Sequence, residues 1–446
     1  MDSRKVIMQS NQSFREPIFL LLAVLFLSGC SGIPDRSQLL SIEEQDLFLE
    51  SFDDMTRSIE GTFWDPEYLE KCWGGLKDDC RNQVKEARTA QEAREAMRRL
   101  LASLEMSHFG VIPDSASEEL SREPSDGEAG MILRVSQGRA IVVRIEEGGA
   151  AEQVGIEPGD EIVKVGEREL QPLIKEWSNS GSRYLPIQAL QSVCSGESGT
   201  EREYLVRGVD GDRSVSLTFQ SPSDEHPKVG MGLISPVTVK MEKRILDGNI
   251  LYLRLNTFFG PMQVMPWFEN AIKEHRDANG MIFDIRGNPG GIGLMACGLA
   301  GWLVEKEGFE LGTMKQKGNE LHFVVNPRLD GWQKPVAILI DEGSASTSEI
   351  MAQGLRDIGR VRLFGRTTAG AALPSLIKSL PNKDLLQMAI ADYVSVSGKR
   401  MEGVGVEPDE VLEVDPDQIR EYGDPTMVRA AYWILGKPGG PESEIR

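Results

Sequence analysis

The sequence predicts an α/β core preceded by a helical domain and by a small domain of short strands. Three observations support this prediction. From about residue 228 to 415, short apolar runs alternate with segments of helical periodicity, which is typical of a layered α/β structure. Residues 37–106 carry apolar side chains at helical spacing. Residues 129–222 contain short apolar runs separated by turn residues.

The length and the charge of the chain limit what it can be. Its 446 residues are too many for one compact core, so two or three domains are expected. The formal net charge of -20 repels phosphate backbones. We therefore expect no nucleic-acid partner.

The N-terminal segment has the pattern of an export signal. Arg4, Lys5 and Arg15 precede an uncharged apolar run at residues 18–27. This run is too short to span a bilayer, which needs about 20 residues in a helix. The pattern is typical of a signal peptide, here residues 1–29.

A cysteine directly follows this segment. The ending Leu-Ser-Gly-Cys at residues 27–30 resembles the lipobox of bacterial lipoproteins. The resemblance implies that Cys30 carries lipid, becomes the mature N-terminus and anchors the protein to a membrane of the cell envelope. Ser31 after the cysteine implies the outer membrane, facing the periplasm. An ordinary export signal with an incidental cysteine is the alternative.

Residues 30–112 form the expected helical domain. Thr89, with Glu92 three residues further on, has the pattern of a capping box at the start of a helix that runs to about residue 104. The polar stretch at residues 113–127 is rich in Ser, Glu and Asp and is expected to be a linker.

A more specific pattern lies at residues 150–162, which read A-A-E-Q-V-G-I-E-P-G-D-E-I. It predicts a short helix, a Pro-Gly turn and a strand, and it resembles the signature of a PDZ domain, here residues 128–222. In PDZ domains a loop of N–H groups holds the C-terminal carboxylate of a peptide that adds as a strand. The matching loop is Gly130, Met131 and Ile132. A PDZ fold that serves only as a lid or spacer is the alternative.

Residues 223–415 contain the alternating core, and residues 416–446 are expected to be a tail with one helix at 424–435. Strands are expected at 250–255, 281–285, 335–341 and 360–365, and helices at 264–276, 290–304 and 346–355.

The remaining cysteines suggest no metal chemistry. Cys72 and Cys80 are close enough in sequence to pair, while Cys194 and Cys297 fall in different expected domains. Cys297 lies in a mostly apolar stretch and is interpreted as a small buried hydrophobic residue. No spacing of Cys and His suits a metal, so none is expected.

One serine lies where a strand turns into a helix. The apolar run at residues 336–340 leads through small residues to Ser346. Free N–H groups at a helix start favour an oxyanion that develops beside such a serine. However, Ser346 and Glu349 also match a plain helix capping box. The Gly-rich turn at residues 284–291 is uninformative alone, because such turns often follow strands.

Three motifs together are much more specific. They are D-I-R-G-N-P-G-G at 284–291, G-S-A-S-T-S-E-I at 343–350 and E-G-V-G-V-E-P-D at 402–409. Their order resembles the tail-specific, or carboxyl-terminal processing, serine protease family (peptidase family S41). The resemblance covers nearly the whole mature chain and implies a crotonase/ClpP-like α/β core with an inserted PDZ domain. It also implies an endopeptidase that cleaves proteins or peptides without a cofactor.

The resemblance also assigns roles to residues. Ser346 would be the nucleophile. The backbone N–H of Thr347 and that of either Gly290 or Gly291 would stabilise the oxyanion.

The usual base of the bacterial processing proteases is absent. There a lysine ends the stretch G-x-x-T-x-G-K, whereas residues 365–371 here read G-R-T-T-A-G-A. Ala371 occupies the lysine position, and Lys378 lies in a different register.

His108 is the expected base instead. It follows Ser107 at the end of the helical domain, which resembles the tricorn-type branch of the family, where a Ser-His pair meets the nucleophile and a distant glutamate. The motif match makes Glu402 that glutamate, and Ser107 and Glu402 would orient the base. The alternatives are a helix-terminal histidine favoured by the helix dipole and a surface glutamate.

Two other functions remain open from the sequence. Without the lysine, the chain could be an inactive lipoprotein that binds peptides through its PDZ domain. A crotonase-like core could also belong to an acyl-binding protein, but an exported protein does not meet cytoplasmic coenzyme A.

Overall fold

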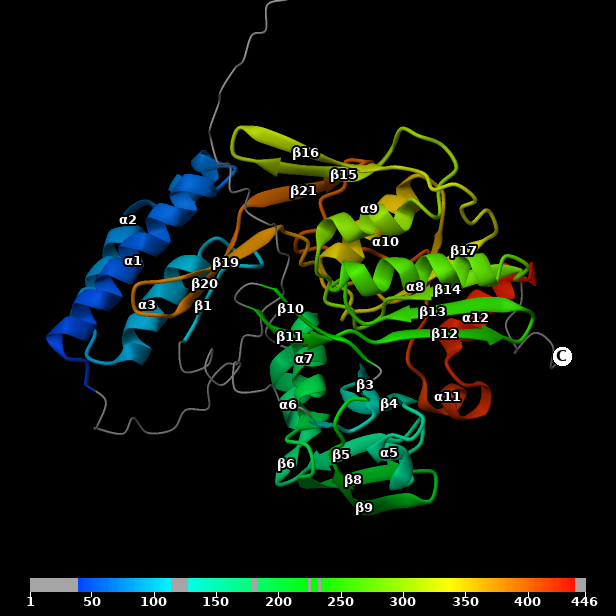
Figure 1. Ribbon diagram of the computed structural model, residues 1–446. Coiled ribbons are helices and arrows are strands. Elements are labelled where there is room, and N and C mark those ends of the chain that lie inside the picture. The colour runs from blue at the N-terminus through cyan, green and yellow to red at the C-terminus, as the bar shows by residue number, and fades with distance from the viewer. Residues whose placement is uncertain (1–38, 114–126, 179–182, 224–225, 232–233, 438–446) are drawn as a thin grey trace, which may run out of the picture.

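A computed structural model of the chain describes residues 39–113, 127–178, 183–223, 226–231 and 234–437. A helical domain, a β-rich domain and a layered α/β core can be followed in Figure 1. The expected signal peptide with Cys30 and nearly all of the expected linker lie outside the described residues. Within the described ranges, no helix combines the length and the apolar character that crossing a bilayer requires.

Each helix of the helical domain has a side-chain cap at its N-terminus. Ser41 and Thr89 each form a capping box with the glutamate three residues further on, and Asp65 caps the helix between them. One apolar stripe from each helix enters a shared core. The helices are α1 (Ile42–Thr62), α2 (Pro66–Glu86) and α3 (Ala90–Ala102).

A hairpin from far along the chain completes this domain (Figure 1). β20 (Leu385–Ala389) pairs with β19 (Ser375–Ser379) and also with β1 (Gly110–Ile112), which follows His108. Leu386 is fully buried in the same core as the helices. The helical domain therefore needs strands from outside the residues 30–112 that the sequence indicates.

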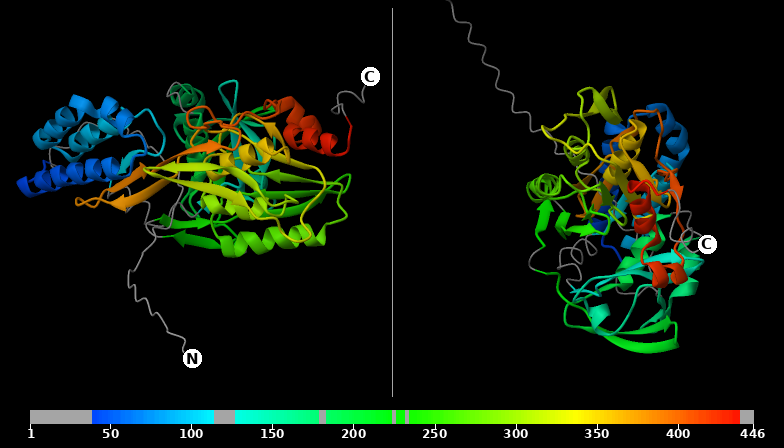
Figure 2. Two further views of the ribbon diagram at one scale, coloured as in Figure 1. Left: turned by 90° about the horizontal axis from the view of Figure 1, so that it is seen from above. Right: turned by 90° about the vertical axis from the view of Figure 1, so that its right-hand side faces the viewer.

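The β-rich domain lies beside the core, and Figure 2 shows it from two further directions. Its sheet has the order β3-β4-β5-β8-β9, so β3 is an outer strand, and α7 packs beside it. The elements are β2 (Gly127–Glu128), β3 (Met131–Ser136), β4 (Arg139–Ile145), α5 (Ala150–Gln153), β5 (Glu161–Val165), β6 (Arg168–Glu169), α6 (Leu170–Ser178), α7 (Tyr184–Val193), β7 (Ser195–Gly196), β8 (Glu201–Gly208) and β9 (Gly211–Thr218).

The core sheet has the order β12-β13-β14-β17-β18-β22, and only the pairing of β12 with β13 is antiparallel. The four strands expected from the apolar runs are confirmed as β13, β14, β17 and β18. The bounds are β12 (Met241–Leu246), β13 (Ile250–Leu255), β14 (Gly280–Asp284), β17 (Val336–Ile340), β18 (Arg362–Gly365) and β22 (Glu410–Val411).

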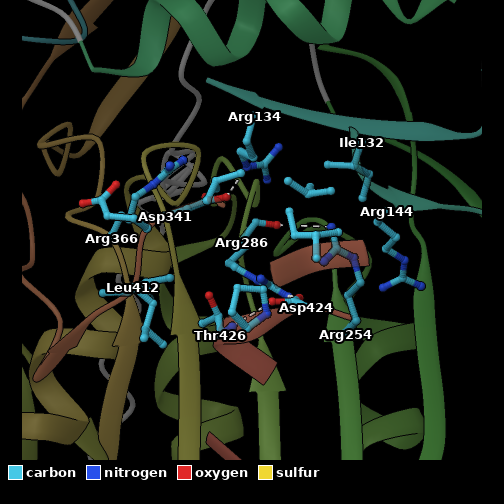
Figure 3. Close-up of a pocket in the computed structure, with 17 residues that line it drawn as sticks. Ile132, Arg134, Arg144, Arg254, Arg286, Asp341, Arg366, Leu412, Asp424 and Thr426 are labelled. Atoms are coloured by element: carbon cyan, nitrogen blue, oxygen red, sulfur yellow. Dashed lines mark hydrogen bonds and ion pairs between the residues drawn. The ribbon is translucent and has the colours of Figure 1, made fainter. Parts of the chain in front are cut away.

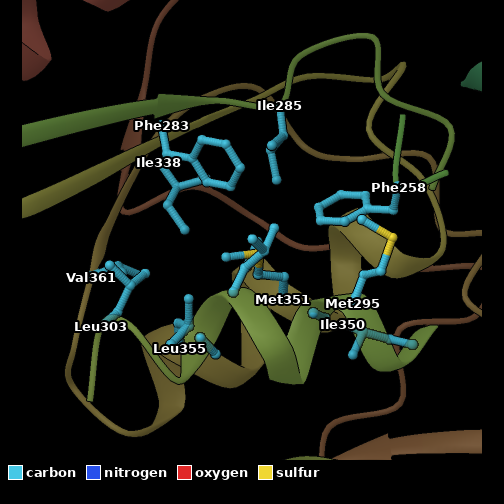
Figure 4. Close-up of a cluster of buried hydrophobic side chains, with 14 of the residues drawn as sticks. Phe258, Phe283, Ile285, Met295, Leu303, Ile338, Ile350, Met351, Leu355 and Val361 are labelled. Atoms are coloured by element: carbon cyan, nitrogen blue, oxygen red, sulfur yellow. The ribbon is translucent and has the colours of Figure 1, made fainter. Parts of the chain in front are cut away.

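Helices cover both faces of this sheet. α8 (Pro261–Glu274), α9 (Gly293–Ala300) and α10 (Thr347–Asp357) pack on one face, and Figure 4 shows part of the apolar layer between them and the strands. α12 (Pro425–Ile434), reached through α11 (Pro416–Tyr422), packs on the other face. The helix expected near 424–435 is thus confirmed, but it forms a layer of the core rather than part of a tail.

Two smaller strand groups flank the core. One is a hairpin that leads from the β-rich domain into the core, and the other is a sheet of order β16-β15-β21. Their bounds are β10 (Lys228–Met231), β11 (Ile234–Thr238), β15 (Phe309–Gln316), β16 (Asn319–Val325) and β21 (Ala391–Ser395).

The cysteines of the described residues are free thiols. Cys72 and Cys80 lie in α2 on the two sides of a kink at Gly74, and both are free, so the disulfide that their spacing allowed does not form. Cys297 packs against the core cluster, as expected, but it is half-buried rather than buried.

We expect the attachment of the hairpin to depend on one ion pair. The guanidinium of Arg94 in α3 donates two hydrogen bonds of 2.8 Å to Asp384, whose side chain is fully buried. Arg94→Ala leaves that carboxylate without its cation and should lower the free energy of unfolding by about 3 kcal/mol in urea denaturation. Asp212→Ala breaks only the exposed pair with Arg207, which still has Glu161 at 3.5 Å, and should cause no measurable change. Equal effects of the two variants would contradict this account.

Candidate active site

Ser346 occupies a strained position between β17 and α10. Its backbone has φ 61° and ψ -116°, which non-glycine residues rarely adopt. Its side chain is fully buried, and its Oγ has no hydrogen-bond partner among the described residues. The capping box that the sequence allowed is present through the carboxylate of Glu349, which accepts the N–H of Ser346, and this leaves Oγ of Ser346 unused.

Glu349 holds this position from one turn further along α10. Its carboxylate accepts the N–H of Ser346 at 2.9 Å, the hydroxyl of Thr368 at 2.5 Å, and the N–H groups of Gly370 and Ala371 at 2.8 and 3.0 Å. Burial raises the pKa of Glu349, and these four donors oppose the rise. The sequence indicated only a helix cap here, so this role was missed.

The two candidate oxyanion glycines differ in what their N–H groups do. The N–H of Gly290 donates to the side chain of Asn288 at 2.9 Å. No hydrogen bond of the described residues uses the N–H of Gly291 or that of Thr347. A Cβ on Gly290 would lie 2.8 Å from the Cβ of Ser346, so the loop approaches the serine as closely as a glycine allows. Gly291 and Thr347 therefore supply the free donors beside Ser346.

Glu402 forms a cluster with the neighbouring residues Ser107 and His108, although it lies 295 positions after Ser107 in the chain. The carboxylate of Glu402 accepts the N–H of Ser107 at 2.6 Å and its hydroxyl at 2.9 Å. The same hydroxyl lies 2.6 Å from Nδ1 of His108. Ser107 thus links the imidazole to the carboxylate. His108 is buried with φ 63°, and its Nε2 has no partner among the described residues.

A short stretch of backbone connects this cluster to the serine. The N–H of Ala371 donates to Glu349, and the next N–H, that of Ala372, donates to Glu402 at 3.2 Å. One side of the stretch therefore supports the turn that carries Ser346, and the other supports the residues around His108.

Burial controls the protonation of the cluster. It lowers the pKa of His108 to about 4, so the imidazole is neutral at pH 7. It raises the pKa of Glu402 to about 7, although the hydrogen bonds from Ser107 oppose the rise. When Glu402 is ionised, Ser107 donates its proton to the carboxylate and accepts the proton of Nδ1. Nε2 of His108 then carries a free lone pair.

Lys378 lies elsewhere. Its ammonium contacts the carboxylate of Asp54 and the hydroxyl of Ser58 in α1, both at 2.9 Å. It therefore belongs to the contact between the hairpin and the helical domain.

Two buried ion-pair networks support the turns around Ser346. Asp341, at the end of β17, accepts the N–H groups of Gly287 and Gly343 and pairs with Arg134 of the β-rich domain. Figure 3 shows Arg134 and Asp341 meeting at the edge of a cavity of about 50 Å³. The same cavity is bordered by Arg286, which pairs with both Asp284 and Asp424.

The expected peptide loop lies in the β-rich domain. Gly130 has φ 71° and directly precedes β3. With Met131 and Ile132 it borders a groove of about 910 Å³, which also reaches Gly287 and Pro289 of the loop before Gly290. Within the described residues, no group of three or more His, Cys, Asp or Glu side chains could hold a metal ion.

Comparisons with known proteins agree with this geometry. Residues 249–412 match the model of peptidase family S41. The chain is 23% identical over 415 residues to a chloroplastic C-terminal processing peptidase of Tetradesmus obliquus, covering 89% of this chain and 82% of that protein. It is 24% identical over 398 residues to a carboxyl-terminal-processing protease of Synechocystis, covering 88% and 86%.

Solved structures share the fold. The photosystem II D1 C-terminal processing protease superposes with a TM-score of 0.54 at 22% identity, over 85% of this chain and 94% of that one. Mature CPAF superposes with a TM-score of 0.58 at 15% identity, over 88% and 99%. The family match and these relatives agree with the serine turn described above: residues 249–412 are those of a family S41 peptidase core, and the chain is a serine-type peptidase.

Proposed function

We propose that the protein is an endopeptidase that processes the carboxyl-terminal regions of protein substrates with a Ser-His-Glu mechanism. One observation carries the proposal: Ser346 Oγ and His108 Nε2 are both buried without a partner among the described residues, and the linked Ser107 and Glu402 lie behind the histidine. Buried polar atoms are normally hydrogen-bonded, so two that are not suggest groups kept free for a substrate.

Each residue then has a chemical task. His108 Nε2 takes the proton of Ser346 as Oγ attacks the substrate carbonyl. The N–H groups of Thr347 and Gly291 stabilise the oxyanion. His108 returns the proton to the leaving amine, and a water molecule releases the acyl group by the same steps in reverse order. Through Ser107, Glu402 stabilises the charged imidazole.

The proposal includes a PDZ domain at residues 128–222 within a chain whose core is of the crotonase/ClpP-like type. Among the described strands β3 pairs only with β4, and its other edge could accept a substrate as an added strand. The loop of Gly130, Met131 and Ile132 would hold the terminal carboxylate, and the groove from this loop to Pro289 supports a path toward Ser346.

The proposal further places the enzyme at the outer membrane, with Cys30 as its lipid-bearing N-terminus. The support is the apolar run that ends in Leu-Ser-Gly-Cys. Cys30→Ser should move the protein out of the membrane fraction or leave its precursor uncleaved, as judged by fractionation and mass. Normal cleavage with unchanged membrane association would contradict lipidation.

The catalytic assignment predicts a ranked series of variants. Ser346→Ala and His108→Ala should each lower kcat by about 10⁴-fold or more, because residues that act as a unit fail together. Ser107→Ala and Glu402→Gln each break the link behind the histidine and should cost less. Lys378→Ala, outside the site, should keep near wild-type turnover of an unfolded protein. Full activity of His108→Ala would disprove the assignment.

As the pH falls, the first decline of kcat/KM should reflect protonation of Glu402 rather than of His108. Because burial lowers the pKa of His108 to about 4, the base itself stays neutral well below pH 6.5. Glu402, with a pKa of about 7, gains a proton first as the pH falls and then no longer stabilises the imidazolium. The kcat/KM profile should therefore decline below about pH 7. Glu402→Gln should remove this step, and an unchanged step in that variant would contradict the assignment.

A free substrate terminus should matter if the PDZ domain binds it. A peptide with a C-terminal amide should show a higher KM than the same peptide with a free carboxylate, because the loop N–H groups lose a charged acceptor. Steady-state kinetics on the full chain measures this directly. Equal KM values for the two peptides would count against the PDZ assignment.

A further inference from the structure

Two large apolar side chains are exposed to solvent near the oxyanion loop, the turn at residues 284–291 that ends in the proposed donor Gly291. Met262, in the first turn of α8, is 82% exposed, and Leu294, in the first turn of α9, is 61% exposed. Single exposed apolar residues are common on protein surfaces. These two differ because the fold brings them to the same edge of the molecule.

The position follows from the topology of the core. β13, β14 and β17 are parallel, and α8, α9 and α10 follow them and pack on one face of the sheet. All three helices therefore begin at the carboxyl edge of the sheet. α9 packs against both α8 and α10. Figure 1 shows α8, α9 and α10 as neighbours. Met262 and Leu294 lie in the first turns of α8 and α9, and Ser346 directly precedes α10.

A contact between α8 and α9 places Met262 and Leu294 on facing sides of the two helices. One turn further along the helices, the Met265 side chain lies within 2.9 Å of where a Cβ on Gly298 would be. Residues three or four positions apart share a helix face, so Met262 and Leu294 lie on the faces that meet at this contact.

The backbone before both helices is tied to the oxyanion loop. Phe258 and Gly291 form a parallel bridge. The N–H of Phe258 donates to the carbonyl of Gly290, and the N–H of Ile292 donates to the carbonyl of Phe258. On its other side, the carbonyl of Gly291 accepts the hydroxyl of Thr347 at 3.1 Å. Leu294 is therefore only three residues from the free N–H of Gly291.

We propose that Met262, Leu294 and the half-buried Ile292 form an apolar subsite for a substrate side chain that flanks the scissile bond. A carbonyl bound at the N–H of Gly291 leaves the adjacent substrate residue next to these side chains. Burying an apolar side chain there removes apolar surface of both partners from water, so the subsite selects apolar residues over polar ones. This inference rests on the proposed Ser346 chemistry.

The test compares two peptides that differ only in a leucine or a serine beside the bond that is cleaved. Leu294→Ser and Met262→Ser should each lower kcat/KM for the leucine peptide by about tenfold or more and leave the serine peptide within twofold. Leu294→Met keeps an apolar side chain and should retain the wild-type preference for the leucine peptide. Leu329→Ser is the matched control, because Leu329 is 91% exposed in a loop outside the core sheet and helices.

The rate of reaction with a small fluorophosphonate separates binding from chemistry. This probe needs only Ser346, its base and the oxyanion donors, so its rate should match the wild type in all these variants. Peptide discrimination that is unchanged, or lost equally in Leu329→Ser, would overturn the subsite alone. A wild-type protein that does not react with the probe would overturn the proposed function and the subsite with it.

Discussion

The candidate active site depends on two carboxylates, the buried Glu349 and the half-buried Glu402, which accept consecutive N–H groups. Glu349 accepts the N–H of Ala371 and fixes the strained backbone of Ser346, while Glu402 accepts the N–H of Ala372 and fixes Ser107. Removal from water makes such acceptors costly unless they are fully bonded. With these hydrogen bonds made, the two carboxylates hold the backbone of Ser346 and of Ser107 in place. One short piece of backbone thereby connects the turn that carries Ser346 to the residues around His108.

The proposed mechanism needs no lysine at position 371. Ala371 leaves that position without an amine, but its backbone still holds Glu349. The proposed base, His108, lies at the end of the helical domain, and β1, which directly follows His108, is anchored by β20. The hairpin that completes the helical domain therefore also fixes the position of His108. If His108 is the base, folding of the helical domain is required to form the active site.

Much of the core was predictable because its signals are local. The apolar runs at β13, β14, β17 and β18 and the small residues around Ser346 reveal strands and a turn without knowledge of tertiary structure. The meeting of Ser107, His108 and Glu402 was predictable only through motif resemblance, since nothing local relates residues so far apart. The four bonds to Glu349, the choice of Gly291 over Gly290 and the placement of β19 and β20 in the helical domain depend on tertiary contacts, which a single sequence does not encode in any local pattern.

The most direct test of the account is whether His108 activates Ser346. Reaction of the full chain with a fluorophosphonate, followed by intact mass and peptide mapping, reports the reactivity of that hydroxyl alone. The account predicts one adduct on Ser346 in the wild type and a rate at least about 10³-fold lower in His108→Ala, with no loss in Lys378→Ala. An adduct that forms on Ser346 of His108→Ala at the wild-type rate would contradict it.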